Sequence, residues 1–366
     1  MRRMIEYSVL HARRFSVAFS RRFSTLALSG AVLISAALFS SCTHKELCYH
    51  HPHTANVRID VDWSEFLKDD PTGMTVAVYP ADGGRPVTRL TNTTSHALFK
   101  LPAGSYNSIT FNQSESEYGS VSFRGMDRFE TAEVYANVTK STWYKTRTDG
   151  ERLGSEPEWI GTDHCEGSAV TEEMVDAARE EYISSLGTKT RTRSASSEFV
   201  IATHVPENII YTVYVTAKVK GFYNLRSARA SLSGLAEGYL LGQGKVTDHE
   251  VTQLMEEWSK KVDEHDPTMG TITAKMTCFG LPGNHAAKAE ENDLVLSILL
   301  VDNKTVLDFP FRVGDKFIHD HEKKELHLFM ELDKVLPDVP PEGGSAGAFD
   351  ATVDDWGDEE DYEIGL

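Results

Sequence analysis

The stretch IIYTVYVTAKVKG, residues 209–221, decides the fold class because apolar and polar side chains alternate along it. A strand turns successive side chains to opposite faces, so a period of two predicts a strand with one buried face. Valine, isoleucine and tyrosine, which favour strands, fill most of the alternating positions. The side chains expected in the core are those of Ile209, Tyr211, Val213, Val215, Ala217 and Val219.

The same period recurs on both sides of this stretch. Toward the N-terminus, residues 57–63 and 74–78 alternate in the same way, and ADGGRP at residues 81–86 is typical of a turn. Toward the C-terminus, residues 293–313 indicate a hairpin that turns near Asp302. We therefore predict an all-β protein in which two sheet faces share a core.

Two segments show helical spacing instead. VTEEMVDAAREEYISSL, residues 170–186, spaces its apolar residues by four and carries acids near its N-terminal end, where the helix dipole favours them. DHEVTQLMEEWSKKVDEH, residues 248–265, places Val251, Met255 and Trp258 on one stripe. We expect one or two short helices, the second of which covers a sheet.

The length of 366 residues indicates more than one domain, because a single core rarely serves so long a chain. GTKTRTRSASS, residues 187–197, has no apolar anchor and is typical of a linker. The predicted division is an N-terminal β domain at residues 56–186, a linker at 187–198, a C-terminal β domain at 199–338 and an acidic tail at 339–366.

Residues 1–41 are typical of a secretion signal. Six arginines precede the apolar run at residues 26–39, which is shorter than the roughly 20 residues that a permanent membrane span needs. The run ends in Phe39-Ser40-Ser41-Cys42, which resembles a bacterial lipobox, although Phe39 stands where leucine is usual. We expect cleavage before Cys42, lipidation of Cys42, and a tether over residues 42–55.

The net charge excludes one class of partner. The chain has 37 basic and 55 acidic side chains, and without the six arginines and one glutamate of residues 1–41 there remain 31 and 54, a net charge of −23. Nucleic-acid binding depends largely on neutralising phosphates with basic side chains. We therefore expect no nucleic-acid partner.

Catalytic signatures are absent from the sequence. It has no G-x-S-x-G, H-E-x-x-H, Walker A or dinucleotide-binding motif, so neither an enzyme nor a cofactor is predicted. Cys278 falls on the apolar side of an alternating segment and is expected in the core. Cys165, in GTDHCEG, is expected in a loop.

Two histidine clusters contain possible metal ligands, but neither predicts a metal site. His44, Cys48, His50, His51 and His53 cluster close to the expected lipid anchor, where no rigid outer shell of ligand partners is evident. In the second cluster, two imidazoles share a strand face and a third lies across a charged turn that looks exposed to solvent. The histidines of this second cluster, which are the candidate metal ligands, are His319, His321 and His327.

The acidic tail contains two short alternating segments, which solvated tails rarely have. Such segments are able to add a strand to the exposed edge of another sheet. The candidate donor-strand residues are Phe349, Ala351, Val353, Tyr362, Ile364 and Leu366.

Taken in order, several of these segments resemble one family. They are CTHKELCYHHPHT, VRIDVDW, MTVAVYPADGGRPV, LFKLPAGSYNSITFN, IIYTVYVTAKVKGFYNLRSARASLSGLAEGYLL and the closing GGSAGAFDATVDDWGDEEDYEIGL. Together they are similar to the Bacteroidales lipoproteins of unknown function that are related to fimbrillin-A-associated anchor proteins. The resemblance covers nearly the whole chain after the signal.

The resemblance implies two tandem transthyretin-like β-sandwich domains and a lipid anchor in the outer membrane, on the cell surface of a Bacteroidales bacterium. It also implies a non-catalytic role as a fimbrial anchor, accessory subunit or adhesin, with fimbrial subunits or other surface proteins joined by strand exchange as partners.

An outer-membrane glycan-binding lipoprotein is the alternative, because aromatic faces stack on sugars and the chain has five tryptophans. These are Trp63, Trp143, Trp159, Trp258 and Trp356. A metal-dependent enzyme would require His319, His321 and His327 to converge.

Overall fold

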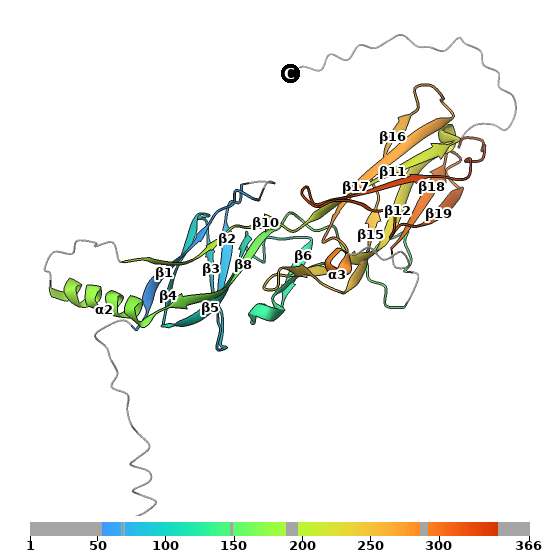
Figure 1. Cartoon of the computed structure of the whole chain (residues 1–366). Helices are drawn as coiled ribbons and strands as arrows, with labels where there is room; N and C mark the ends of the chain where they lie inside the picture. Colours follow the sequence, from blue (N-terminus) through green and yellow to red (C-terminus); the bar gives the residue numbers. More distant parts are fainter. Residues whose placement is uncertain are drawn as a thin grey trace, which may run out of the picture. The chain divides into compact units, whose positions relative to one another are not determined.

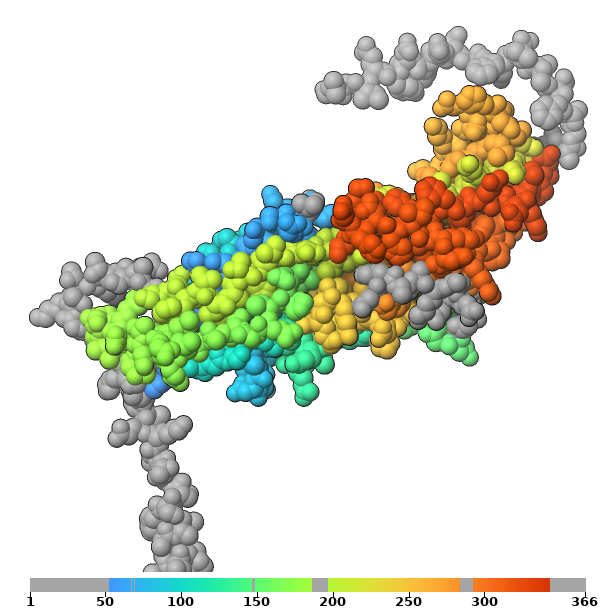
Figure 2. All heavy atoms as spheres, viewed as in Figure 1, coloured from blue at the N-terminus to red at the C-terminus, as the bar shows by residue number. Residues whose placement is uncertain are grey.

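A computed structural model describes residues 53–66, 68, 70–146, 149–187, 197–285 and 292–342, which are drawn in colour in Figure 1 and Figure 2. Strands dominate these residues, which confirms the all-β class (Figure 1). The expected signal, most of the tether and most of the acidic tail lie outside the described residues. Within them, no helix is both long enough and apolar enough to cross a membrane.

A first β-sandwich is built from a sheet of three strands and a sheet of five, with orders β4-β1-β9 and β10-β8-β5-β2-β3. Alternate residues of β1 are fully buried between the sheets, as the period of two predicts. The strands are β1 Ala55–Val61, β2 Met74–Pro80, β3 Val87–Thr91, β4 His96–Leu101, β5 Gly104–Asn112, β8 Gly161–Val170, β9 Phe199–His204 and β10 Glu207–Asn208.

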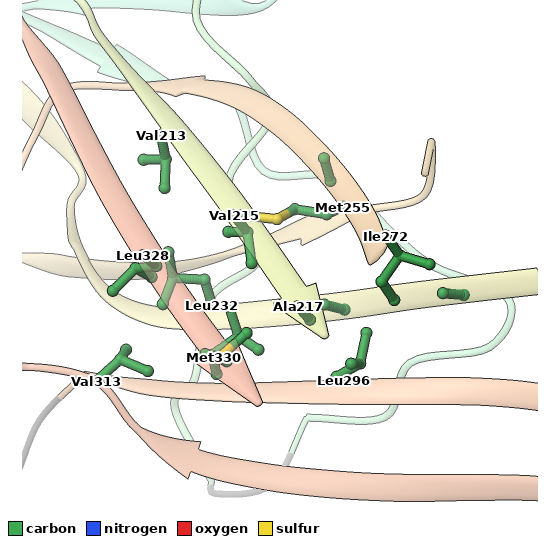
Figure 3. Packing of buried hydrophobic residues seen from close by; sticks show 14 of the residues in the cluster. Val213, Val215, Ala217, Leu232, Met255, Ile272, Leu296, Val313, Leu328 and Met330 are labelled. Carbon is green, nitrogen blue, oxygen red and sulfur yellow. The ribbon is translucent and has the colours of Figure 1, made fainter. Parts of the chain in front are cut away.

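A second β-sandwich has sheets with orders β16-β17-β11-β21-β20 and β15-β12-β18-β19. Its core includes Val213 and Val215 of the deciding stretch, opposite Leu232 and Leu296 of the other sheet (Figure 3). The strands are β11 Tyr211–Lys220, β12 Leu225–Ala236, β15 Glu250–Met255, β16 Ser259–Val262, β17 Met269–Cys278, β18 Asp293–Leu300, β19 Val306–Arg312, β20 Ile318–Asp320 and β21 Glu325–Glu331.

A further sheet, with order β14-β13-β7-β6, combines strands from both halves of the chain. Glu133 in this sheet receives two hydrogen bonds from the guanidinium of Arg124, at 2.6 and 2.7 Å, and the buried Glu237 pairs with Arg152. The strands are β6 Val121–Arg124, β7 Glu133–Ala136, β13 Gly238–Leu240 and β14 Lys245–Val246. The helical elements are α2 Glu172–Gly187, α3 Pro282–His285, and the 3₁₀ turns η1 Phe129–Thr131 and η2 Phe222–Asn224.

Two expected elements agree with the structure. α2 occupies most of the segment expected to be helical. β18 and β19 form the expected hairpin, in which one carboxylate oxygen of Asp302 accepts the N–H groups of Lys304 and Thr305.

The helix expected at residues 248–265 is wrong, because this segment forms the strands β15 and β16. Val251 and Met255 are buried as expected, but residues four apart share a face in a strand as well as in a helix. The pattern therefore did not distinguish the two structures. Pairing with β12 and β17 decides in favour of strands.

The domain boundary expected at residue 199 also differs from the strand pairing. β9 pairs in parallel with β1, and β10 pairs with β8, so residues 199–208 complete the first sandwich. The composition of residues 187–197 predicted a linker, but composition does not determine which sheet the following strand joins. Cys165, expected in a loop, lies within β8.

Candidate functional site

Ser108, His204 and Asp163 form a polar cluster in the first sandwich. Nε2 of His204 lies 2.8 Å from Oγ of Ser108, and Nδ1 lies 3.3 Å from Oδ2 of Asp163, which is a long contact. The order of groups is that of a serine hydrolase, in which an acid orients an imidazole beside a hydroxyl. The side chains come from β5, the end of β9 and β8.

Burial makes this cluster unsuitable for nucleophilic catalysis. Ser108 is 1% exposed and His204 is 0% exposed, so no substrate carbonyl reaches the hydroxyl. Asp163 also accepts the backbone N–H groups of His164 and Val205, each at 2.8 Å. Burial raises the pKa of Asp163, but the nearby imidazole of His204 and these two backbone hydrogen bonds outweigh it and leave the pKa below its ordinary value.

The cluster therefore joins β9 to the opposite sheet. β9 belongs to the three-stranded sheet, whereas Ser108 and Asp163 stand on the five-stranded sheet. No sequence motif marks the cluster, because its three members are separated by dozens of residues and each alone is an ordinary strand residue.

The three candidate metal ligands His319, His321 and His327 do not converge. Ile318 pairs with His327 and His319 pairs with Leu326, so His319 and His327 point to opposite faces. His327 instead lies 3.1 Å from a carboxylate oxygen of Glu325. His319 stacks on His321, and burial, with a contribution from the His321 charge, lowers the pKa of His319. No group of three possible metal ligands occurs among the described residues.

The cysteines differ in accessibility. Cys278 is fully buried in β17, which confirms the core assignment, and burial raises its pKa to about 12. Cys165 is partly exposed. Cys42 and Cys48 lie outside the described residues, as do the candidate ligands His44, His50 and His51.

The outermost strand β19 borders an apolar groove. It ends the order β15-β12-β18-β19, so within the described part of the chain one of its edges has no partner strand. Its inward-facing side chains Leu307, Phe309 and Phe311 pack on the core yet stay partly exposed. Together with residues 333–335 and Pro337 they line a cavity of about 400 Å³, which we call the β19 groove.

The described chain ends near this groove. The N–H of Glu342 donates to the carbonyl of Val301, at the start of the hairpin that leads into β19. All six candidate donor-strand residues, Phe349 to Leu366, follow this point and lie outside the described residues.

Four of the five tryptophans are described, and all four are partly buried. Nε1 of Trp63 donates to the carbonyl of Thr94, and Nε1 of Trp143 donates to Glu256. Trp159 and Trp258 line one cleft. Trp356 lies outside the described residues.

One curated protein is similar to nearly the whole of this chain. A curated protein of Bacteroides ovatus, "Putative fimbrium anchoring subunit Fim4B", is 22% identical over 357 residues, which span 91% of this chain and 96% of that protein.

The solved structures that are similar to the chain include a putative adhesin and a fimbrial anchor protein. A putative adhesin from Bacteroides ovatus has a TM-score of 0.49 and 18% identity, covering 82% of this chain and 99% of its own. The fimbrial anchor protein Mfa2 from Porphyromonas gingivalis has a TM-score of 0.42 and 10% identity, covering 76% and 90%.

The model of one protein family, described as "Domain of unknown function (DUF5119)", matches residues 41–256. This match spans more than half of the chain and agrees with the resemblance seen in its sequence segments. The chain belongs to the DUF5119 family.

Proposed function

We propose that this protein is a non-catalytic cell-surface subunit that anchors a fimbrium or serves as its accessory subunit. The observation that carries the proposal is the similarity to the relative named a fimbrium anchoring subunit, which extends along nearly the whole of both chains. Similarity over this length applies to the complete chains of the two proteins rather than to one shared domain. The burial of Ser108 and His204, which bars the hydroxyl from substrate, supports a role without catalysis.

The attachment to the cell is a lipid on Cys42, and residues 42–55 are the tether that leads into β1. The lipobox-like sequence before Cys42 supports this part of the proposal. β1 begins at Ala55 in the middle of its sheet, between β4 and β9, so the tether ends at a firmly held strand. Pulling force on the fimbrium would then pass through a strand that is bonded on both sides.

The contact with other fimbrial subunits is strand exchange, in which a segment of one subunit completes the sandwich of another. The acidic tail of this chain is the segment that donates a strand, and the β19 groove is the kind of site that accepts a strand. Phe349, Ala351 and Val353 alternate as a donor requires. Leu307, Phe309 and Phe311 present the matching row of partly covered apolar side chains. Pro310 removes one backbone donor from β19, which limits indiscriminate pairing at this edge.

Lipidation and location are tested on cells of the native bacterium by mass spectrometry of the N-terminus and by protease treatment of intact cells. The proposal expects a diacylated Cys42 N-terminus and a chain that external protease removes. A Cys42→Ala variant should be released from the membrane. An unlipidated chain that protease cannot reach would overturn the proposed location.

Strand exchange is tested separately with a chain that ends at residue 342 and with Val335→Arg in the β19 groove. Val335 is 64% exposed, so the arginine fills the groove at little cost to folding. Val262→Arg, at the exposed Val262 of β16, is the matched control. Fimbrial subunits should no longer co-purify with the shortened chain or with the Val335 variant. If both retain them at wild-type levels, strand exchange through these elements is wrong.

A further inference from the structure

A polar and aromatic cleft of about 1040 Å³ lies over the outer face of the five-stranded sheet of the second sandwich. Its floor comes from the neighbouring strands β17 and β11 and from the start of β21. Its walls come from residues 254–259, which run from the end of β15 to the start of β16, and from the segment around Trp159. We call it the Trp258 cleft.

The alternation of β17 explains why the floor is polar. Ile272, Ala274 and Met276 turn inward and are buried, which leaves the intervening side chains for the outer face. Those intervening side chains are Thr273, Lys275 and Thr277, and all three line the cleft. β11 adds Tyr214, which pairs with Lys275 on one side and with His327 on the other.

Aromatic rings stand among these polar groups. Tyr214 stacks on His327 with centroids 5.1 Å apart and an angle of 10° between the planes. Because β11 lies between β21 and β17, the second face of the tyrosine ring is turned toward β17 and the cleft. Trp258 forms part of the wall, held by a hydrogen bond of 3.2 Å from its Nε1 to the carbonyl of Met255. One face of Trp159 is already covered by the ammonium of Lys68, 4.0 Å from the ring centroid.

The charges in the lining are mixed, with a small excess of acids. The carboxylates are those of Glu156, Glu256, Glu257 and Glu325, against the ammonium groups of Lys68, Lys140 and Lys275. Glu156 accepts the backbone N–H of Thr277 at 3.2 Å, and burial raises the pKa of Glu156 despite that bond. An acidic ligand would meet more carboxylates than ammonium groups, so this lining disfavours anionic ligands.

The strands of the floor exclude an added peptide strand as the occupant of the cleft. β17 is bonded to β16 and β11, and β11 is bonded to β17 and β21, so neither offers a free edge to which a peptide strand could add. Recognition here depends on side chains. Ring faces, hydroxyl groups and carboxylates together suit a ligand with apolar C–H faces and many hydroxyl groups.

We propose that the Trp258 cleft binds a neutral oligosaccharide. Tyr214 and Trp258 contact the C–H faces of the sugar rings, while Glu256, Glu257 and Lys275 bond to the hydroxyl groups. This function goes beyond anchoring a fimbrium and does not depend on it, because neither the β19 groove nor the tail takes part.

The proposal is tested by calorimetric titration of the full chain, purified in detergent, with neutral hexasaccharides derived from mannan, xylan, cellulose and starch. At least one should bind, and Trp258→Ala and Tyr214→Ala should each weaken that binding about tenfold or more. Tyr223→Ala is the matched control, because Tyr223 is 58% exposed and is not part of the cleft. Thermal melting of each variant separates loss of a contact from loss of the fold.

Three results of the titrations would overturn the proposal. The first is that none of the four sugars gives a heat of binding at concentrations up to about 10 mM. The second is that Tyr223→Ala weakens binding as much as Trp258→Ala and Tyr214→Ala do. The third is that the acidic sugar oligogalacturonate binds in preference to the neutral sugars. Attachment of fimbriae should be unchanged in the Trp258 and Tyr214 variants. A loss of attachment would instead identify the cleft as a contact for a protein subunit and would likewise contradict the proposal.

Discussion

Replacing Asp163 by asparagine tests whether the buried polar cluster holds β9 in the first sandwich. The carboxylate accepts N–H groups of His164 and Val205 and faces the imidazole of His204. Hydrogen bonds to a charged group stabilise by roughly 1.5–3 kcal/mol each, and asparagine keeps one acceptor oxygen. We therefore expect Asp163→Asn to lower the free energy of unfolding by about 2 kcal/mol, and the melting temperature by about 4–8 °C.

The dependence on pH gives this prediction a second readout. The folded state lowers the pKa of Asp163, so the carboxylate stabilises the fold fully above its ordinary pKa, and this stabilisation is lost as the pH falls through the lowered value. The difference between wild type and Asp163→Asn should hold from pH 7 to about 5 and shrink below about pH 4.

Thermal melting and urea unfolding, both followed by circular dichroism, measure the effect. Asp176→Asn is the control, because Asp176 forms an exposed ion pair with Arg179 on α2 and should contribute less than about 1 kcal/mol. If the two variants melt together at pH 7, the cluster does not hold β9 and the reasoning fails.

Three further predictions concern other parts of the fold. An alkylating reagent should label the partly exposed Cys165 in the native chain but reach the buried Cys278 only after unfolding, as peptide mass spectrometry would show. Gly238→Ala should destabilise the sheet that joins both halves, because a Cβ there would overlap the carbonyl oxygen of Val134; a melting temperature equal to wild type would contradict this. A fragment of residues 53–198 should unfold at lower urea concentration than a fragment of residues 53–208, since only the longer one contains β9 and β10.

The period of two predicted much of the second sandwich, because a strand with one buried face has apolar side chains at alternate positions of its sequence. The alternation of residues 209–221 and of residues 272–278 corresponds to β11 and β17, with the expected side chains in the core. The same reasoning failed at residues 248–265, because Val251 and Met255 satisfy both periods. Only the partner strands β12 and β17 resolve that ambiguity.

The candidate sites depended on information that a single sequence does not hold. His319, His321 and His327 were close in sequence, but the register of β20 and β21 turns His327 to the other face. The β19 groove exists because β19 happens to be the last strand of its sheet, which composition cannot reveal. Lipidation of Cys42 and strand donation by the tail stay predictions.

The most direct test of the account is to delete the gene in its own bacterium and to measure fimbriae attached to cells against fimbriae released into the medium. An anchoring or accessory subunit predicts that the total amount persists while most fimbriae are shed, and that the wild-type chain, but not the Cys42→Ala variant, restores attachment. Fimbriae that remain attached to the deletion strain at wild-type levels would contradict the central claim.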